Sequence, residues 1–145
     1  MAATATKVSS KTANSIGDAA LASRLSREIE GDVRFDAFSR GRYSTDASHY
    51  QIEPIGVVIP KTDKDIARVI AIAADEGLPV LPRGAGTSQC GQTVGEAIVV
   101  DVSHHLNQIV GFDPDARRIT VQPGVVLDDL NAFLAPHKLL FPVDM

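Results

Sequence analysis

The sequence is organised around a glycine-rich stretch, Pro82-Arg83-Gly84-Ala85-Gly86-Thr87-Ser88, which continues as Gln89-Cys90-Gly91-Gln92. It follows the short apolar run 78–81, which is bounded by prolines and is typical of a buried strand. Two glycines around one alanine allow a sharp turn and leave backbone N–H groups open to a guest. Thr87 and Ser88 add hydroxyls, and Arg83 adds a positive charge. Such a loop suits a phosphate or pyrophosphate, although the residues alone equally fit a simple turn.

Two established phosphate-binding loops do not match this stretch. The dinucleotide motif G-x-G-x-x-G requires a third glycine where Gln89 stands. The P-loop pattern fits residues 86–93 except that Gln92 replaces the lysine that reaches the phosphates. Both motifs also need a helix directly afterwards, whereas this chain continues into the strand-like run 97–100. The loop therefore belongs to neither class.

The segment before the loop predicts a strand, a helix and a second strand. Residues 55–59 form an apolar run closed by a proline, as expected for a strand buried on both faces. Thr62 and Asp65 have the spacing of a capping box, apolar residues follow at helical spacing, and Gly77 supplies the stop. This order predicts a right-handed crossover between parallel strands. The glycine-rich loop then lies at the carboxyl end of a parallel strand, where ligands of open α/β sheets bind.

The first fifty residues predict a tail and a lead segment. Residues 1–17 contain little to bury and are expected to be flexible. Asp18 is a candidate cap for a helix with Leu21, Leu25 and Ile29 on one face. Further on, aromatic residues alternate with arginines up to position 50. An anion-binding surface is one interpretation of that pattern, and a hydrophobic clamp with solvated arginines is the interpretation we favour.

The rest of the chain predicts a change from parallel to antiparallel strands. Residues 97–100 form a third strand. Residues 107–112 and 118–122 form two more strands, joined by a turn that contains a proline. A short helix follows, with Leu127, Leu130 and Leu134 facing inward and a stop at Pro136. Residues 139–142 are expected to be another short extended piece.

Composition excludes several classes of function. The chain has 145 residues, a net charge of −4, one cysteine and no tryptophan, so nothing favours nucleic acid, an anionic membrane surface or a disulfide framework. No apolar run approaches the roughly 20 residues that span a bilayer, and the amino terminus lacks a signal-peptide core. We therefore expect a cytoplasmic protein, with peripheral membrane association left open.

Neither histidine nor cysteine chemistry has a clear signature. His104 and His105 are neighbours that point to opposite faces of an extended segment, so we predict no metal site. Cys90 has no nearby histidine or lysine that would activate its thiol, so a small packed residue is the favoured interpretation. We predict no catalytic residue in this chain.

Several motifs in the right order resemble the FAD-linked oxidases of the vanillyl-alcohol oxidase/p-cresol methylhydroxylase (PCMH) type. Residues 82–88 with Gly91 and Gln92 are similar to the pyrophosphate loop of that family, and residues 43–48, 53–60 and 118–125 extend the likeness. From about Arg34 to Met145 the chain resembles the branch that contains D-lactate dehydrogenase, the glycolate oxidase flavin subunit and D-2-hydroxyglutarate dehydrogenase. The resemblance implies an α+β fold, namely the N-terminal part of a PCMH-like FAD-binding domain, in which a small parallel β-α-β subdomain precedes antiparallel strands and a short helix.

The resemblance also implies the cofactor and its contacts. The backbone N–H groups of Gly84 to Ser88 are expected to bind the FAD diphosphate, together with the hydroxyls of Thr87 and Ser88. Thr87 stands where relatives with covalent flavin have a histidine, which implies non-covalent FAD. The implied cofactor-binding residues are Pro82, Arg83, Gly84, Ala85, Gly86, Thr87, Ser88, Gly91, Gln92 and, near the flavin, Asp144.

In the resembling family, a second glycine-rich segment and a substrate domain follow the part matched here. We therefore expect a fragment, with a tail over 1–17, a lead segment over 18–50, and part of the FAD-binding domain over 51–145. The complete enzyme is expected to oxidise a D-2-hydroxy acid to the 2-oxo acid with an unassigned electron acceptor, whereas this chain alone is not catalytically competent. The alternatives are a non-redox nucleotide- or phosphate-binding module and a structural fragment. An exposed sheet edge would favour self-association.

Overall fold

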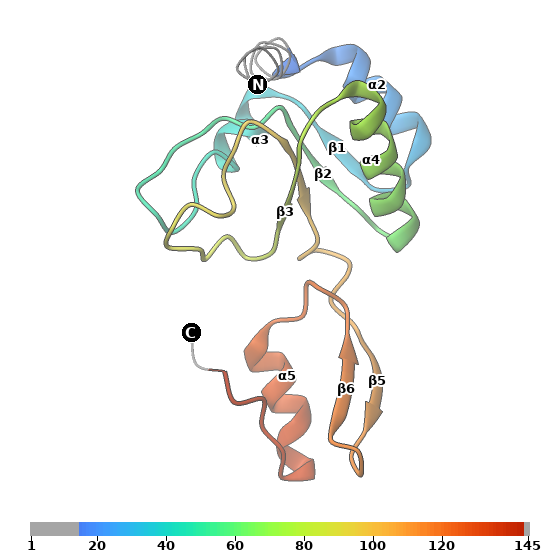
Figure 1. The fold of residues 1–145 in the computed structure, drawn as a ribbon, viewed down its shortest axis with the longest axis vertical. Helices are drawn as coiled ribbons and strands as arrows, with labels where there is room; N and C mark the ends of the chain where they lie inside the picture. Colours follow the sequence, from blue (N-terminus) through green and yellow to red (C-terminus); the bar gives the residue numbers. More distant parts are fainter. Residues whose placement is uncertain (1–14, 144–145) are drawn as a thin grey trace, which may run out of the picture.

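The structure is a computed structural model that describes residues 15–143. Figure 1 shows a sheet with helices in the upper part and a hairpin with one helix in the lower part. The helices include α2 (Ala19–Glu28), α3 (Ala37–Arg42), α4 (Asp63–Glu76), α5 (Leu127–Leu134) and the 3-10 turn η1 (Ala135–His137). The strands include β1 (Asp32–Arg34), β2 (Gly56–Ile59), β3 (Val80–Arg83), β4 (Ile98–Asp101), β5 (Ile109–Asp113) and β6 (Arg118–Val121).

The upper sheet has the strand order β1-β2-β4-β3. Strands β2 and β3 both run parallel to β4, which lies between them, with Val57 and Leu81 each paired with Val99. The predicted parallel strand–helix–strand unit is therefore confirmed. Strand β3 is an edge strand, which is where a sheet tolerates Pro82, since proline has no N–H to donate. Strand β1 pairs antiparallel with β2 and was not predicted.

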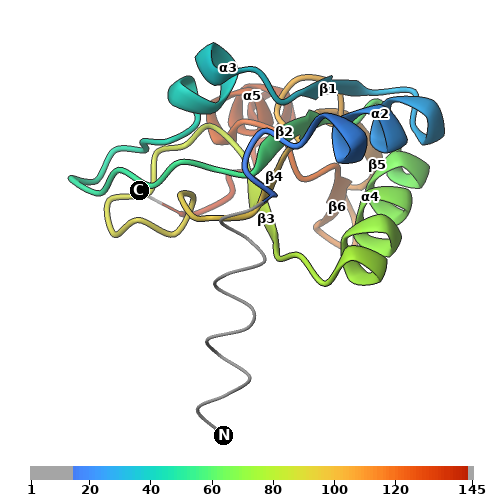
Figure 2. The same cartoon turned by 90° about the horizontal axis from the view of Figure 1, so that it is seen from above.

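The two faces of this sheet are covered differently. Figure 2 shows α2 and α4 on one face and the loops 43–55 and 84–97 on the other. The helix side holds the larger core, which includes Leu25, Val58, Ile72, Ile98 and Val100. The loop side holds a smaller cluster, made of Tyr43, Val57, Ile59 and Val99 with Leu81 against it. Alternate residues of a strand point to opposite faces of the sheet, and here both faces are covered. Strands β2 and β4 are therefore buried along their whole length, as was predicted for β2.

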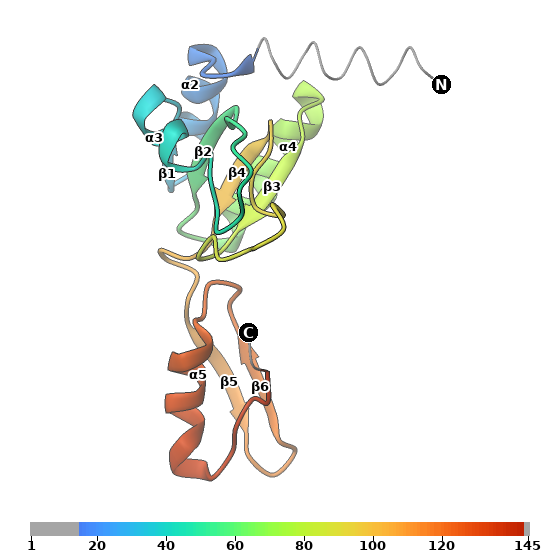
Figure 3. The same ribbon diagram turned by 90° about the vertical axis from the view of Figure 1, so that its left-hand side faces the viewer.

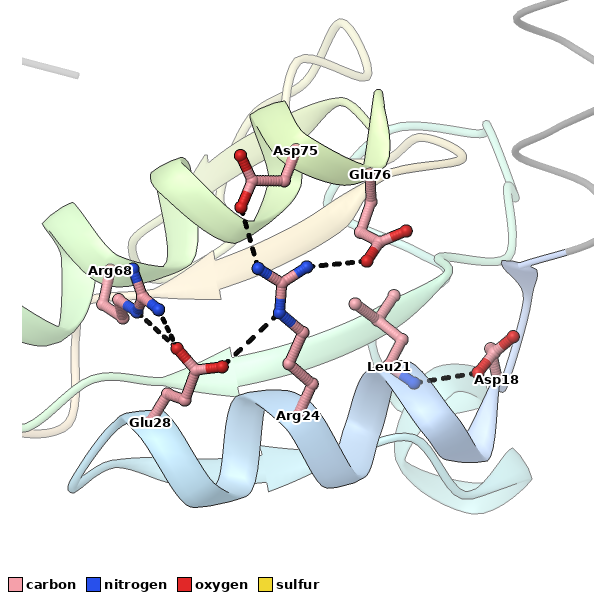
Figure 4. A network of polar contacts seen from close by, with 7 residues as sticks. All are labelled: Asp18, Leu21, Arg24, Glu28, Arg68, Asp75 and Glu76. Carbon is pink, nitrogen blue, oxygen red and sulfur yellow. Dashed lines mark hydrogen bonds and ion pairs between the residues drawn. The ribbon is translucent and has the colours of Figure 1, made fainter.

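Helix α2 begins and packs as its sequence predicts. The Asp18 carboxylate accepts hydrogen bonds from the N–H groups of Ala20 and Leu21 at 2.7 and 2.8 Å. On the side that faces α4, Arg24 forms ion pairs with Asp75 at 2.8 Å and Glu76 at 2.7 Å (Figure 4). Glu28 joins the same network through Arg24 and Arg68, so ion pairs along the surface complement the apolar contact between the two helices. The network fixes α2 over the sheet.

Helix α4 has the capping box that its sequence predicts. The Thr62 hydroxyl accepts from the Asp65 N–H at 3.2 Å, and the Asp65 carboxylate accepts from the Thr62 N–H at 3.2 Å. Asp65 is buried and also accepts from the N–H groups of Glu30 and Lys61, so it ties the α2–β1 connection to the start of α4. Burial acts to raise the pKa of Asp65, but the backbone N–H groups around it, those of Glu30, Lys61, Thr62 and Gly31, together hold the pKa below its ordinary value. Gly77 ends the helix in the left-handed conformation, with a φ of 65°.

The lead segment agrees in part with the favoured interpretation, a hydrophobic clamp. Phe35 and Tyr43 are buried, as a hydrophobic clamp requires, but Phe38 and Tyr50 are exposed, so the clamp interpretation is wrong for those two. Two of its arginines bind carboxylates of their own chain, namely Arg34 with Asp32 and Arg40 with Glu53, each at 3.0 Å. This pairing favours a structural role over an anion-binding surface.

The lower part consists of the β5–β6 hairpin and α5, which lie side by side in Figure 3. Phe112 packs edge-on against Phe133 with ring centroids 5.4 Å apart, and His137 lies beside both rings. Helix α5 ends at Leu134 and Pro136 lies in the 3-10 turn after it. Residues 139–142 form no strand or helix, and the expected short extended piece pairs with no strand among the described residues.

The two parts meet at Gly124. Its N–H donates to the Leu106 carbonyl at 2.8 Å, directly below the sheet. A Cβ at this position would stand 2.8 Å from that carbonyl oxygen and 3.0 Å from the Ser103 Cα, so only glycine fits the junction. Within residues 15–143, no helix is long and apolar enough to cross a membrane.

Candidate functional site

A cleft of about 1290 Å³ lies between the glycine-rich loop and the start of α5. Because β3 and β4 are parallel, the loop after β3 and Ser103 after β4 both follow the carboxyl ends of strands, and together they form one wall. The opposite wall comes from the segment that enters α5 and from residues 140–143. The lining residues are Gly84–Gln89, Thr93, Ser103, Pro123–Asp128, Asn131 and Leu140–Val143.

The backbone of the loop is free to bind an anion. Among the described residues, no protein group accepts a hydrogen bond from the N–H groups of Gly84 to Gln89. Gly86 has a φ of +71°, a conformation that side-chain-bearing residues rarely adopt. Around Gly84, the space that a Cβ would need is open. A run of unpaired N–H groups on the wall of a cleft is a suitable cradle for a phosphate group.

The predicted cofactor-binding residues divide into two groups. Those from Gly84 to Ser88 line the cleft, whereas Pro82, Arg83, Gly91 and Gln92 do not. Asp144 lies outside the described residues. The cleft thus brings together the central part of the predicted set, whereas the flanking residues lie outside its lining.

Ser88 is held within the loop itself. Its hydroxyl donates to the side-chain oxygen of Gln92 and accepts from the Gln92 N–H, the latter at 3.2 Å. Gly91, with a φ of +74°, lies against the Tyr50 ring, where a Cβ would stand 2.6 Å from the ring carbon Cδ2. Thr87 is exposed in the cleft wall. Of the two predicted hydroxyl ligands, Thr87 is therefore the one that no protein group occupies among the described residues.

A second loop supports the first. Asp46 accepts hydrogen bonds from the Ser48 N–H at 2.9 Å and the Thr93 hydroxyl at 3.0 Å. Bonds from Ser48 first, and then from Thr93, lower the pKa of Asp46 to about 2, so the carboxylate is ionised at neutral pH. The Ala47 N–H donates to the Gly86 carbonyl at 3.1 Å. The loop that contains Asp46 thus holds Gly86 and Thr93 in place, a role that sequence reasoning missed.

Asp101 is a buried hub below the cleft. The residue is 4 % exposed, and its carboxylate accepts from the Tyr43 hydroxyl at 2.6 Å and the Ser103 hydroxyl at 2.6 Å. The Ser103 N–H also donates to it at 2.9 Å. Asp46 and Asp101 both belong to Asp-x-Ser sequences in which the carboxylate accepts from the N–H two residues on, and this local signal could have identified both.

The hydrogen bond from Tyr43 to Asp101 predicts a pH effect on stability. Burial first, and then this bond, raise the pKa of Tyr43 from 10.0 to about 12. The folded state holds the neutral hydroxyl, so the contribution is complete below pH 10 and is lost as the pH rises through 12. Between about pH 9 and 12 we expect the free energy of unfolding to fall by about 2 kcal/mol more in the wild type than in Tyr43→Phe. Denaturant unfolding at each pH measures this, and parallel curves would contradict it.

The cysteine and the histidine pair singled out in the sequence do not line the cleft. Cys90 is an exposed free thiol, so its prediction as a packed residue is wrong. The rings of His104 and His105 are 6.2 Å apart, and His104 lies 3.6 Å from the Asp101 carboxylate. No group of three or more metal-ligating side chains occurs in the described part of the chain.

Comparison with known proteins agrees with this geometry. The family model of the FAD binding domain matches residues 54–145. The chain is 37% identical to D-2-hydroxyglutarate dehydrogenase of Haemophilus influenzae over 82% of its own length and 12% of that protein. It is 36% identical to the glycolate oxidase subunit GlcD of Bacillus subtilis, over 81% of its own length and 26% of that protein. The chain therefore spans 12% and 26% of the lengths of these two relatives.

The fold has solved counterparts. The wild-type BBE-like 1 protein of Physcomitrella patens superimposes with a TM-score of 0.67, at 20% identity, over 80% of this chain and 26% of that one. At that identity the likeness concerns the fold, and it confirms the predicted α+β class. The family match covers most of the chain and includes the cleft-lining loop. The chain therefore belongs to the FAD-binding domain family of the FAD-linked oxidases, and its cofactor is FAD.

Proposed function

We propose that this chain binds the diphosphate of FAD on the loop Gly84–Gln89, as part of an enzyme that oxidises a D-2-hydroxy acid. The observation that carries the proposal is the run of unpaired N–H groups along the wall of the cleft. These N–H groups donate to the diphosphate oxygens, and hydrogen bonds to a charged acceptor are stronger than neutral ones. The chain fits the cofactor because Gly84 leaves room at the wall and the cleft is large enough for a nucleotide.

The polar side chains of the loop have different roles. The Thr87 hydroxyl donates to the diphosphate, whereas Ser88 and Gln92 hold the shape of the loop. Thr87 has no nucleophilic ring nitrogen, so FAD is held without a covalent bond. Asp144 is proposed to lie near the flavin. When bound, FAD supplies the redox chemistry of the enzyme.

The substrate class comes from the relatives. The two relatives described above are named for D-2-hydroxyglutarate and for glycolate, which are both 2-hydroxy acids. We assign no base to this chain, because none of its described histidines or lysines lines the cleft. Residues 51–145 act as the N-terminal part of the FAD-binding domain, and the groups that bind the hydroxy acid belong to other parts of the enzyme.

The test is the visible flavin spectrum of the purified chain after it is mixed with FAD and desalted. We expect flavin bands to remain on the protein and to be released by acid precipitation, as non-covalent binding requires. Adding D-lactate or D-2-hydroxyglutarate without oxygen is expected to leave the bands unbleached, since this chain lacks the substrate-binding groups. Flavin that stays on the precipitate would contradict the non-covalent mode. Bleaching would contradict the assignment of catalysis to other parts.

Calorimetric titrations of the chain with FAD and with ADP separate FAD binding from a general phosphate-binding module. If the chain binds ADP and FAD equally, the adenosine diphosphate half accounts for recognition, and the cleft serves any such nucleotide. Tighter binding of FAD shows that the isoalloxazine or ribityl part also contacts the protein. Absence of binding by either ligand would overturn the proposed cradle.

A further inference from the structure

Arg83 is not part of the lining of the cleft that it was expected to serve, although it directly precedes Gly84. Its Nη1 donates to the carbonyl oxygens of Thr45 at 2.9 Å, Thr93 at 3.3 Å and Tyr43 at 3.4 Å. These carbonyls belong to the segment before β2 and to the returning limb of the glycine-rich loop. One guanidinium therefore bridges two segments, of which one lies 38 residues before Arg83 and the other 10 residues after it.

Gly86 lies directly over this guanidinium. A Cβ at Gly86 would stand 2.8 Å from the Arg83 Cζ and 3.0 Å from its Nε. Two features therefore favour glycine at position 86. Its φ of +71° is rare for other residues, and the Arg83 side chain occupies the space that a Cβ would need. The Gly86 carbonyl accepts from the Ala47 N–H, so the peptide above the guanidinium is fixed on its other side as well.

The guanidinium is itself supported from below. Its Cζ lies 5.1 Å from the centroid of the Tyr43 ring, which is within the range of a cation–π contact. The Tyr43 hydroxyl donates to the buried Asp101 at the carboxyl end of β4. Arg83 also pairs with Asp101 in the register of β3 and β4, and its carbonyl accepts from the Val102 N–H at 3.0 Å. A continuous column therefore runs from the sheet through Tyr43 and Arg83 to Gly86.

We propose that Arg83 is a positioning residue that sets the conformation of the FAD cradle from behind, rather than a ligand of the diphosphate. The inference rests on the proposed function for the identity of the ligand, but the column exists without it. A planar guanidinium can stack on a ring and donate to several carbonyls at once, which an ammonium group on a flexible stem does less well. The N–H groups of Gly84 to Gln89 keep their orientation because Gly86 cannot move toward the sheet.

The test compares Arg83→Met and Arg83→Lys with the control Arg42→Met, which removes an exposed arginine of α3. Amide hydrogen exchange is measured on the FAD-free chain. We expect the Ala47 N–H to exchange at least about tenfold faster in both Arg83 variants and unchanged in the control, because its acceptor Gly86 loses its support. If exchange at Ala47 is unaffected in the Arg83 variants, the positioning role is wrong. A purely electrostatic ligand would also let Arg83→Lys keep normal FAD affinity, whereas we expect a loss in both.

A double-mutant cycle tests the contact between Arg83 and Gly86 independently, through stability alone. Gly86→Ala is made in the wild type and in Arg83→Ala, and the shift of the denaturation midpoint is measured in each. We expect a smaller shift in the Arg83→Ala background, because the side chain beneath Gly86 is gone and only the backbone strain remains. Equal shifts would show that the guanidinium does not lie under Gly86. Both measurements use the FAD-free chain. A failure of FAD binding would therefore overturn the proposed function only. The role of Arg83 would still be decided by the exchange rate of the Ala47 N–H and by the double-mutant cycle.

Discussion

A valine at position 84 is expected to weaken FAD binding by about 100-fold and to leave the fold intact. Gly84 lines the cleft, its φ is not in the left-handed region, and a Cβ there meets no atom within 4 Å. The added side chain therefore causes no clash inside the protein, but it fills the space that the diphosphate needs. A 100-fold loss equals about 2.7 kcal/mol, the value of one or two hydrogen bonds to a charged group.

The matched control for this substitution is Gly41→Val. Gly41 also has open space around its Cβ position, but it lies in α3, outside the cleft. FAD titrations and denaturant unfolding are measured on both variants. We expect both to unfold within about 1 kcal/mol of the wild type, and only Gly84→Val to lose FAD affinity. Normal FAD binding by Gly84→Val would show that the diphosphate does not pass over this residue.

Alanine at position 124 is expected to give the second large effect, on stability and binding together. The atoms that its Cβ would meet are backbone atoms of the turn below β4, including the Leu106 carbonyl oxygen and the Ser103 Cα. Backbone cannot rotate away as a side chain can, so the junction must open. We expect a loss of about 1–3 kcal/mol of unfolding free energy from this overpacking. FAD affinity falls as well, because Gly124 and the entry to α5 form one wall of the cleft.

Gly111→Ala is the control for this second prediction. Gly111 lies in β5 away from the cleft, and a Cβ there is 3.7 Å from the nearest atom, on Thr120, which is an ordinary contact. Denaturant unfolding and FAD titration are compared for the two alanine variants. Similar stability and FAD affinity in both would contradict the described packing at Gly124.

Elements with local signals could be predicted from the sequence. Asp18, the Thr62–Asp65 pair and Gly77 each satisfy backbone groups within a few residues, and the predicted starts of α2 and α4 and the predicted end of α4 agree with the structure. Helix α2 ends at Glu28, before the predicted stop at Gly31. Strand β1 has no such signal. It has three residues and forms only because β2, over twenty residues later in the chain, offers a free edge. Such pairing depends on the assembled sheet and is not visible in a local pattern.

In the site, too, features with a local sequence signal could be predicted and features that depend on distant residues could not. The glycine-rich loop was placed correctly after a parallel strand, because a strand followed by a tight turn is a local pattern. The orientation of Arg83 was not predictable, since its partners Tyr43 and Thr45 come from a segment about forty residues earlier. Nor was the position of Gly124, whose small size is required by Val102 and Leu106. That the Thr87 hydroxyl donates to the diphosphate stays a prediction, whereas the Ser88 hydroxyl, which was predicted to do the same, donates to Gln92 in the structure.

The most direct test of the cradle is a titration of the isotope-labelled chain with FAD, followed by amide resonances in nitrogen–proton correlation spectra. The N–H groups of Gly84 to Gln89 have no protein acceptor among the described residues, so each is free to form a new hydrogen bond. We predict that these amides show the largest shifts, that ADP moves the same set, and that amides of α2 and α4 stay in place. FAD binding that shifts other amides and leaves Gly84 to Gln89 unmoved would contradict the account, because the diphosphate would then be bound elsewhere.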